Sequence, residues 1–216
     1  MLVPDARYLV PLGALDPVHA APLADAGLTP FRAVRRAAPW LQPGARALII
    51  GFGGLGQFAL QYLRRRDGLQ VVVCDTDPDK RAQALAAGAD AAADPPRGEP
   101  LAGALEDAAD AVFDFVGTDA TLQLGASLLA PGGLLMVIGE GGGTLGFRFD
   151  ATALETWLTT SVWGSLSELR EVAALAGSGK LTWDVELVPL GDAAKAHDRL
   201  AAGQVRGRIV LVPAVN

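Results

Sequence analysis

Residues 46–56 read R-A-L-I-I-G-F-G-G-L-G, and this stretch decides the fold. Its first five residues, 46–50, form a short apolar run of the kind that a strand covered on both faces needs. The glycine-rich turn that follows fits the pattern G-x-G-x-x-G and leads directly into a helical apolar pattern at 55–65. A strand, a glycine turn and a helix in immediate succession predict a phosphate-binding βα corner.

Each glycine of this turn has its own physical role in such a corner. Gly51 permits the tight turn, Gly53 lets the backbone approach a pyrophosphate, and Gly56 lets the helix pack close to the sheet. Gly54 and Leu55 lie at the helix start, where free backbone N–H groups face the phosphates. Because a chain with 26 glycines can match the pattern by accident, the flanking strand and helix carry the argument.

An acid follows the next predicted strand. Asp75 stands about 20 residues beyond the last glycine, where a carboxylate accepts hydrogen bonds from the adenosine ribose. It also repels a 2′-phosphate, since a like-charge contact at 4 Å costs roughly 4 kcal/mol at an effective dielectric constant of 20, before solvent screening. The pattern therefore predicts NAD as the cofactor. Lys80, in the following helix, either reaches the same ribose or is simply solvated, and the sequence favours neither.

Strand-like runs alternate with helical patterns through the central part of the chain. Such alternation predicts parallel strands joined by right-handed crossovers. We therefore expect an α/β protein with a doubly wound parallel sheet, the Rossmann fold. Residues 94–103 indicate a surface loop. Beyond residues 46–65, the predicted strands and helices are, in chain order, Gln70–Cys74, Pro78–Ala87, Ala111–Val116, Ala120–Leu129 and Leu134–Ile138.

The flanks of this region are less regular. We divide the chain into a linker and helix at 1–44, a dinucleotide-binding domain at 45–180 and a C-terminal return segment at 181–216. The elements predicted in the flanks are a helix near Asp25–Arg36, strands at Thr144–Phe149 and near Thr159–Trp163, helices at Ser167–Ala176 and Asp192–Ala202, and a last strand at Arg208–Val212.

Composition excludes several classes of protein. A formal net charge of −6 argues against a nucleic-acid surface, which needs clustered Lys and Arg. The single cysteine, Cys74, excludes a disulfide framework. No apolar run is long enough to span a bilayer, and the first 13 residues lack the apolar core of a signal peptide. We expect a soluble, cytoplasmic protein without a membrane or nucleic-acid partner.

Stretches along nearly the whole chain resemble the C-terminal part of the medium-chain, zinc-dependent alcohol dehydrogenases. The resemblance implies an NAD-dependent oxidoreductase that transfers a hydride between an alcohol or carbonyl substrate and NAD(H). It also implies a homo-oligomer paired through the edge segment 144–149. The matching stretches are A-A-P-L-A-D-A-G-L-T-P-F-R-A-V (20–34), P-G-A-R-A-L-I-I-G-F-G-G-L-G (43–56), D-T-D-P-D-K (75–80), A-G-A-D (87–90), P-G-G-L-L-M-V-I-G (131–139), S-V-W-G-S (161–165) and L-A-A-G-Q-V-R-G-R-I-V-L-V-P (200–213).

The same resemblance implies roles for individual residues. Asp25 stands where several family members supply a catalytic zinc ligand, and Thr29 matches a threonine beside the nicotinamide. Arg208 matches an arginine that reaches the pyrophosphate, a role that suits an always-charged guanidinium. The remaining residues that the resemblance assigns to the cofactor are Val116 and Gly117, which close the strand facing it, and Ile138, Gly139, Val162 and Trp163, whose segments hold the carboxamide.

One part of the family pattern has no counterpart in this sequence. Family members begin with a GroES-like domain that supplies a Cys, usually a His, and a Ser or Thr proton relay. A catalytic zinc site needs three protein ligands and an open position. Besides Asp25, the soft donors here are only His19, Cys74 and His197. We predict no zinc site in this chain alone, with Asp25 as a remnant ligand.

Two functions remain in competition at this point. The first is the NAD-binding domain of an alcohol dehydrogenase-like oxidoreductase, inactive or weakly active alone. The second is a stand-alone NAD(H)-binding module or partner subunit without redox catalysis. A third, non-redox use of the cleft has no nucleophile–base constellation to support it. A short-chain reductase is also unlike this chain, because the tyrosines Tyr8 and Tyr62 do not begin its Tyr-x-x-x-Lys motif.

Overall fold

The computed structural model describes residues 2–94 and 108–214. Contacts divide the chain into a sheet unit, residues 29–163, and a flanking unit, residues 1–28 and 164–216. The division at 1–44, 45–180 and 181–216 stays a prediction. Apart from Asp94, the predicted loop 94–103 lies outside the described residues.

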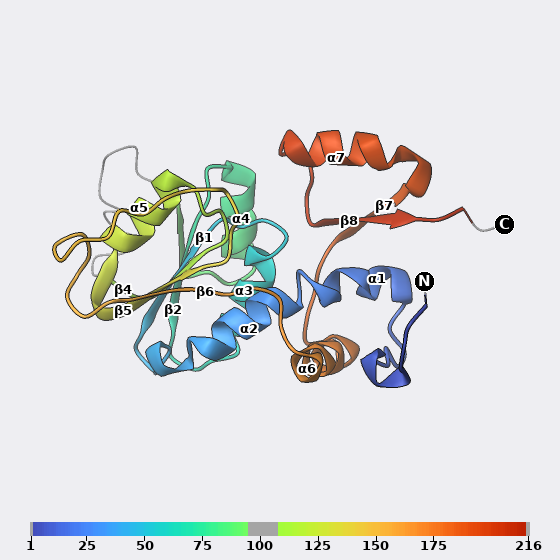
Figure 1. Ribbon diagram of the computed structural model, residues 1–216, viewed down its shortest axis with the longest axis horizontal. Helices are drawn as coiled ribbons and strands as arrows, with labels where there is room; N and C mark the ends of the chain where they lie inside the picture. The colour runs from blue at the N-terminus through green and yellow to red at the C-terminus, as the bar shows by residue number, and fades with distance from the viewer. Residues whose placement is uncertain (1, 95–107, 215–216) are drawn as a thin grey trace. The chain divides into compact units, whose positions relative to one another are not determined.

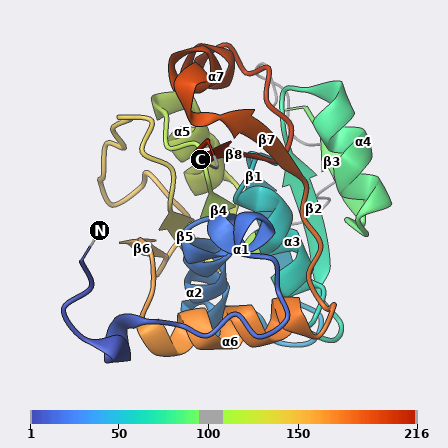
Figure 2. The ribbon, with the colours of Figure 1, turned by 90° about the vertical axis from the view of Figure 1, so that its right-hand side faces the viewer.

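The sheet unit is built on a six-stranded parallel sheet with the order β3-β2-β1-β4-β5-β6 (Figure 2). The chain moves outward from β1 to β3, returns to the other side of β1, and then moves outward through β4, β5 and β6. This order confirms the doubly wound fold. The strands are β1 Arg46–Ile50, β2 Gln70–Cys74, β3 Ala91–Ala93, β4 Ala109–Asp114, β5 Leu129–Val137 and β6 Trp157–Thr160.

Helices cover the two faces of this sheet, with α5 above it and α2 below it in Figure 1. Helix α4 begins as its sequence predicts, because the Asp77 side chain accepts a hydrogen bond from the Asp79 N–H at 2.9 Å and Pro78 occupies the first turn. Thr118 and Thr121 form a reciprocal cap on α5. The helices are α2 Leu28–Arg36, α3 Gly56–Leu63, α4 Pro78–Ala86 and α5 Asp119–Ser127.

The core lies against the central strands, which are apolar along almost their whole length. Leu48, Val72 and Val112 have no exposed surface, and they pack in one cluster with Ala126 of α5 and Leu135 of β5. Strands covered on both faces bury both of their alternating side-chain rows, which explains why their sequences are nearly continuous apolar runs.

The predicted strand at Thr144–Phe149 is wrong. Residues 142–148 have no regular secondary structure. The backbone of this segment is instead hydrogen-bonded to the residues that follow β4. The Gly143 N–H donates to the Gly117 carbonyl at 2.8 Å, and the Thr144 N–H donates to Asp119 Oδ1 at 2.6 Å. The edge strand on this side of the sheet is β6, which begins two residues before the predicted strand near Thr159–Trp163.

In the flanking unit, two parallel strands are joined by a crossover helix, as parallel pairing requires. Arg199 of the crossover helix α7 donates to both carboxylate oxygens of Glu186 in β7, at 2.6 and 2.8 Å. Strand β7 was not predicted. The elements are α1 Pro17–Ala20, α6 Leu166–Gly177, β7 Val185–Pro189, α7 Ala193–Ala201 and β8 Arg208–Val212. Within the residues described for the whole chain, none of the helices has the length and apolar character needed to cross a bilayer.

Candidate functional site

The carboxyl ends of β1 and β4 lie side by side at the point where the strand order reverses. In open α/β sheets, ligands bind in the crevice outside the carboxyl ends of the strands at such a switch point. The predicted glycine turn leaves β1 at this point. The fold therefore positions the turn where a ligand is expected.

The turn can exist only with glycine at its two ends. Gly51 has φ = 89°, in the left-handed region, and a Cβ there would lie 2.8 Å from Val116 Cγ2. A Cβ on Gly56 would lie 2.1 Å from the carbonyl oxygen of Gly51. Helix α3 is thus packed directly onto the turn, and its N-terminus faces the crevice end of β1.

The middle of the turn is open. Gly53 is exposed, and a Cβ built on it would meet no protein atom within 4 Å. The backbone N–H groups of Gly54 and Leu55 have no acceptor among the described residues, and Leu55 gives α3 no side-chain cap. Uncapped N–H groups at a helix N-terminus are suited to bind phosphate oxygens. The residues present therefore fit a diphosphate.

Asp75 joins the end of β2 to this turn. Its carboxylate is only 8% exposed. Oδ2 accepts a hydrogen bond from the Phe52 N–H at 2.7 Å, and Oδ1 accepts one from the Asp77 N–H at 2.9 Å. Because each carboxylate oxygen has a further acceptor site, Asp75 can still bind a ribose hydroxyl.

A cation beside Asp75 was not predicted from the sequence. Arg81 Nη1 donates to the carbonyl oxygen of Asp75 at 2.8 Å and lies 3.8 Å from Asp94 Oδ2. Its position one helical turn beyond the cap Asp77 was the available signal, because such a side chain can reach back over the strand end. Lys80 is half-buried in α4 and makes no hydrogen bond or ion pair with the described residues.

The structure also brings together four residues assigned to the second half of the cofactor. Val116 and Gly117 follow β4, and Ile138 and Gly139 follow β5. Gly117 has φ = 75°, and a Cβ there would lie 2.1 Å from the Gly139 carbonyl oxygen, so the two segments are in backbone contact. This pairing extends the contact between β4 and β5 beyond the strand ends.

Asp114 holds this pair of segments and was also missed from the sequence. It is completely buried at the end of β4. Its Oδ1 accepts hydrogen bonds from the N–H groups of Val116 at 2.8 Å and Gly117 at 2.9 Å. The predicted strand Ala111–Val116 ends early for this reason. The available signal was an acid inside the apolar run A-V-F-D-F-V.

The remaining residues assigned to the cofactor in the sheet unit differ in exposure. Thr29, at the start of α2, is 3% exposed. Val162 and Trp163 follow β6 and are 58% and 68% exposed, and Trp163 has φ = 43°. Their roles beside the nicotinamide stay predictions.

The flanking unit contains the other two assigned residues. Arg208 Nη2 lies 3.4 Å from Asp25 Oδ2, and both side chains are partly exposed. The position that the family uses for a zinc ligand is therefore paired with a cation here. The roles of Asp25 at a metal and of Arg208 at the pyrophosphate stay predictions.

The described donors do not fit a catalytic zinc ion. Within residues 2–94 and 108–214, no three His, Cys, Asp or Glu side chains gather in a group that could hold a metal. Burial in β2, with added repulsion from Asp75 and Asp94, raises the pKa of Cys74 to about 12, so its thiol stays protonated at neutral pH. His19 Nδ1 lies 2.9 Å from Asp16 Oδ2.

These features define an α/β protein with a doubly wound sheet and a glycine-rich βα corner that fits a diphosphate. Residues 87–211 match the family described as zinc-binding dehydrogenase. The chain belongs to this family, as its sequence motifs predicted.

Individual relatives agree with this assignment. The chain is 36% identical to a D-arabinose 1-dehydrogenase (NADP(+)) of Saccharolobus solfataricus and 33% identical to an NAD-dependent alcohol dehydrogenase of Sulfurisphaera tokodaii, in each case over 99% of this chain. It spans 63% of the length of each of these two relatives. The crystal structure of the alcohol dehydrogenase from Aeropyrum pernix is similar with a TM-score of 0.82 and 36% identity, covering 90% of this chain and 57% of that chain.

Proposed function

We propose that this chain binds a nicotinamide dinucleotide and is the coenzyme-binding part of an alcohol dehydrogenase-like oxidoreductase. The observation that carries the proposal is the turn at Gly53, where open backbone and free N–H groups lie beside the buried carboxylate of Asp75. Membership of the dehydrogenase family and the names of the relatives support the same function.

Each part of this site has a task in binding. The N–H groups of Gly54 and Leu55 and the N-terminus of α3 bind the diphosphate, which neutralises part of its charge. The carboxylate of Asp75 accepts a hydrogen bond from the adenosine ribose. The segments at Val116–Gly117 and Ile138–Gly139 orient the second half. When bound, the nicotinamide supplies a hydride acceptor or donor for an alcohol or carbonyl carbon.

We further propose a preference for NAD(H) over NADP(H). Among the relatives, one is named for NADP and another for NAD, so the choice rests on this chain's own residues. The Asp75 carboxylate lies where a 2′-phosphate would bind, and like-charge repulsion at this position should weaken NADP(H) binding by roughly ten- to thousandfold. Arg81 offsets part of this repulsion, but its Nη1 is already engaged with the Asp75 carbonyl and lies near Asp94.

Fluorescence titration tests the binding proposal directly. NADH added to the purified chain should give saturable binding, and NADPH should bind at least about tenfold more weakly. Asp75→Ala should weaken NADH binding, whereas Asp67→Ala, which removes an exposed carboxylate elsewhere in the sheet unit, should not. No saturation with either coenzyme would contradict the proposal.

The second candidate function is a stand-alone NAD(H)-binding module or a partner subunit without redox catalysis. It is favoured by the donor set, since the described His, Cys, Asp and Glu side chains form no metal-binding group. Absorbance at 340 nm with NAD, zinc and a panel of alcohols distinguishes the two. We expect little or no turnover from this chain alone. Zinc-dependent turnover would exclude the second candidate.

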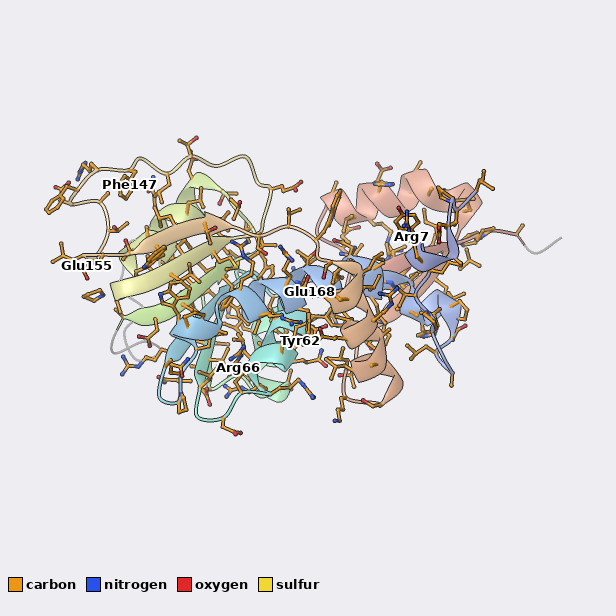
Figure 3. All side chains as sticks on the ribbon, turned by 60° about the horizontal axis from the view of Figure 1, so that its bottom comes forward. Arg7, Tyr62, Arg66, Phe147, Glu155 and Glu168 are labelled. Carbon is orange, nitrogen blue, oxygen red and sulfur yellow. The ribbon has the colours of Figure 1, made fainter. Side chains whose placement is uncertain are left out.

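We also propose that two copies of the chain associate through β6 and through the connection before it, the segment that contains Phe147, Phe149 and Leu154. This edge strand has no neighbour beyond it in the sheet, and its surroundings carry several exposed large apolar side chains. Figure 3 shows one of them, Phe147, on the outer connection. The exposed fractions are 72% for Phe147, 90% for Phe149, 61% for Leu154 and 62% for Trp157.

Sedimentation measures this association. The wild-type chain should sediment as a dimer or larger species, and the double variant Phe147→Ser/Phe149→Ser should shift it toward the monomer. Leu85→Ser is the matched control, because Leu85 is also 50% exposed but lies on α4. A wild-type monomer at all concentrations would contradict the proposal.

A further inference from the structure

Asp114 is a buried carboxylate at a position where burial lowers the stability of the fold. It has no exposed surface, and Oδ2 has no hydrogen-bond partner among the described residues. Burying a polar atom without a partner is unfavourable, so an apolar side chain would suit this core position better if packing alone decided. The hydrogen bonds of Asp114 therefore indicate why a carboxylate occupies this position.

Both the side chain and the backbone of Asp114 hold loops at the crevice. Oδ1 binds the N–H groups of Val116 and Gly117 at 2.8 and 2.9 Å. The carbonyl oxygen accepts hydrogen bonds from the N–H groups of Ile138 and Gly139, also at 2.8 and 2.9 Å. One residue thus fixes the turn after β4 and the segment after β5 with four hydrogen bonds.

The turn held by Asp114 is locked on two further sides. The Gly141 N–H donates to the Val116 carbonyl at 3.0 Å, and a Cβ on Gly141 would lie 2.5 Å from that oxygen. On the other side, the Val116 side chain packs against the backbone of Gly51. Val116 therefore lies between the phosphate-binding turn and the segment after β5, and its position depends on Asp114.

We propose that Asp114 is a positioning residue for the nicotinamide half of the coenzyme, acting through the turn at Val116–Gly117. This inference rests on the proposed function. A doubly wound sheet binds the two mononucleotide halves of a dinucleotide on opposite sides of the switch point. Asp75, after β2, marks the adenosine side, so the other half lies over the ends of β4 and β5. Loss of Asp114 disturbs this second half more than the adenosine half.

The test compares two ligands on four proteins by calorimetry. NADH occupies both halves, whereas ADP occupies only the adenosine and diphosphate part. Asp114→Ala should weaken NADH binding about tenfold or more and leave ADP binding within about twofold of wild type. Asp114→Asn keeps an oxygen acceptor for both N–H groups and should restore NADH binding. The matched control is Asp110→Ala, since Asp110 lies in the same strand and binds the Arg46 N–H at 2.8 Å at the opposite end of the sheet.

A further variant keeps the inference testable if Asp114→Ala does not fold. Gly141→Ala disturbs the same turn through the Val116 carbonyl without removing a buried side chain, and it should show the same selective loss of NADH affinity. Equal NADH affinity in wild type, Asp114→Ala and Gly141→Ala overturns the inference. A parallel loss of ADP affinity and NADH affinity in the two variants also overturns it. If wild type binds neither ligand, the proposed function itself fails, and the inference fails with it.

Discussion

The carboxylate of Asp75 accepts a hydrogen bond from the Phe52 N–H at 2.7 Å, which ties the end of β2 to the glycine turn after β1. The acid of the dinucleotide pattern is thus part of the turn's own structure as well as a candidate ligand for ribose. Because Phe52 is 5% exposed, its N–H depends on this acceptor.

Because of this dual role, we expect Asp75 to stabilise the fold as well as to bind the ribose. Asp75→Ala leaves the buried Phe52 N–H without an acceptor and should lower the free energy of unfolding by about 1–3 kcal/mol. Asp75→Asn keeps an acceptor oxygen and should lose less, while its discrimination against NADPH falls because the charge is gone. Urea unfolding and coenzyme titration measure the two effects. Equal stability of Asp75→Ala and wild type would show that the hydrogen bond is dispensable.

The glycines of the turn separate stability from binding. Gly56→Ala places a Cβ 2.1 Å from the Gly51 carbonyl oxygen, so the helix must move and unfolding should become easier by about 1–3 kcal/mol. Gly53→Ala meets no protein atom and should leave the melting temperature unchanged, yet weaken NADH binding about tenfold. Gly177→Ala, also in open space, is the control for binding. Full NADH affinity in Gly53→Ala would argue against a phosphate over this residue.

Burial controls the reactivity of Cys74. Burial is the main cause that raises the pKa of its thiol from its ordinary value of 9.0 to about 12. The protonated, buried Cys74 thiol contributes to the free energy of unfolding below pH 9, and this contribution is lost as pH rises from 9 toward 12. A thiol reagent at pH 8 should therefore react slowly with the folded chain and rapidly in urea. Fast labelling of the folded chain would contradict the burial of this strand.

The flanking unit should respond to acid through Glu186. Hydrogen bonds from Arg199 lower the pKa of this carboxyl below its ordinary value. A lowered pKa stabilises the fold above the unfolded pKa, and this contribution disappears as pH falls through the folded value. Glu186→Gln should remove that part of the acid dependence of the urea midpoint, and Glu140→Gln, in the sheet unit, should not. Identical pH profiles for wild type and Glu186→Gln would contradict the role of this pair.

The sequence was sufficient for the parts of the fold that depend on local pattern. Strands β1 and β2 and the last strand β8 have the predicted bounds, because their uninterrupted apolar runs end at Gly51, Asp75 and Pro213. The glycine turn was predictable for the same reason. Strand β7 escaped prediction because its V-E-L-V-P pattern is short and only half-buried.

Contacts between distant segments were not predictable from the residues alone. The sequence predicted a strand at Thr144–Phe149, whereas the segment before it is held by Gly139 and Gly141, which approach the backbone of Val116 closely. Asp114 and Arg81 were missed because the groups they hydrogen-bond are backbone atoms, so only their own positions, and no partner residue, could have indicated them.

A crystal of the chain soaked in NADH tests the central claim most directly. We expect density for the diphosphate over Gly53, at the N-terminus of α3, with the adenosine ribose within hydrogen-bonding distance of Asp75. An empty corner beside a coenzyme bound elsewhere, or an Asp75 carboxylate turned away from a bound coenzyme, would contradict it.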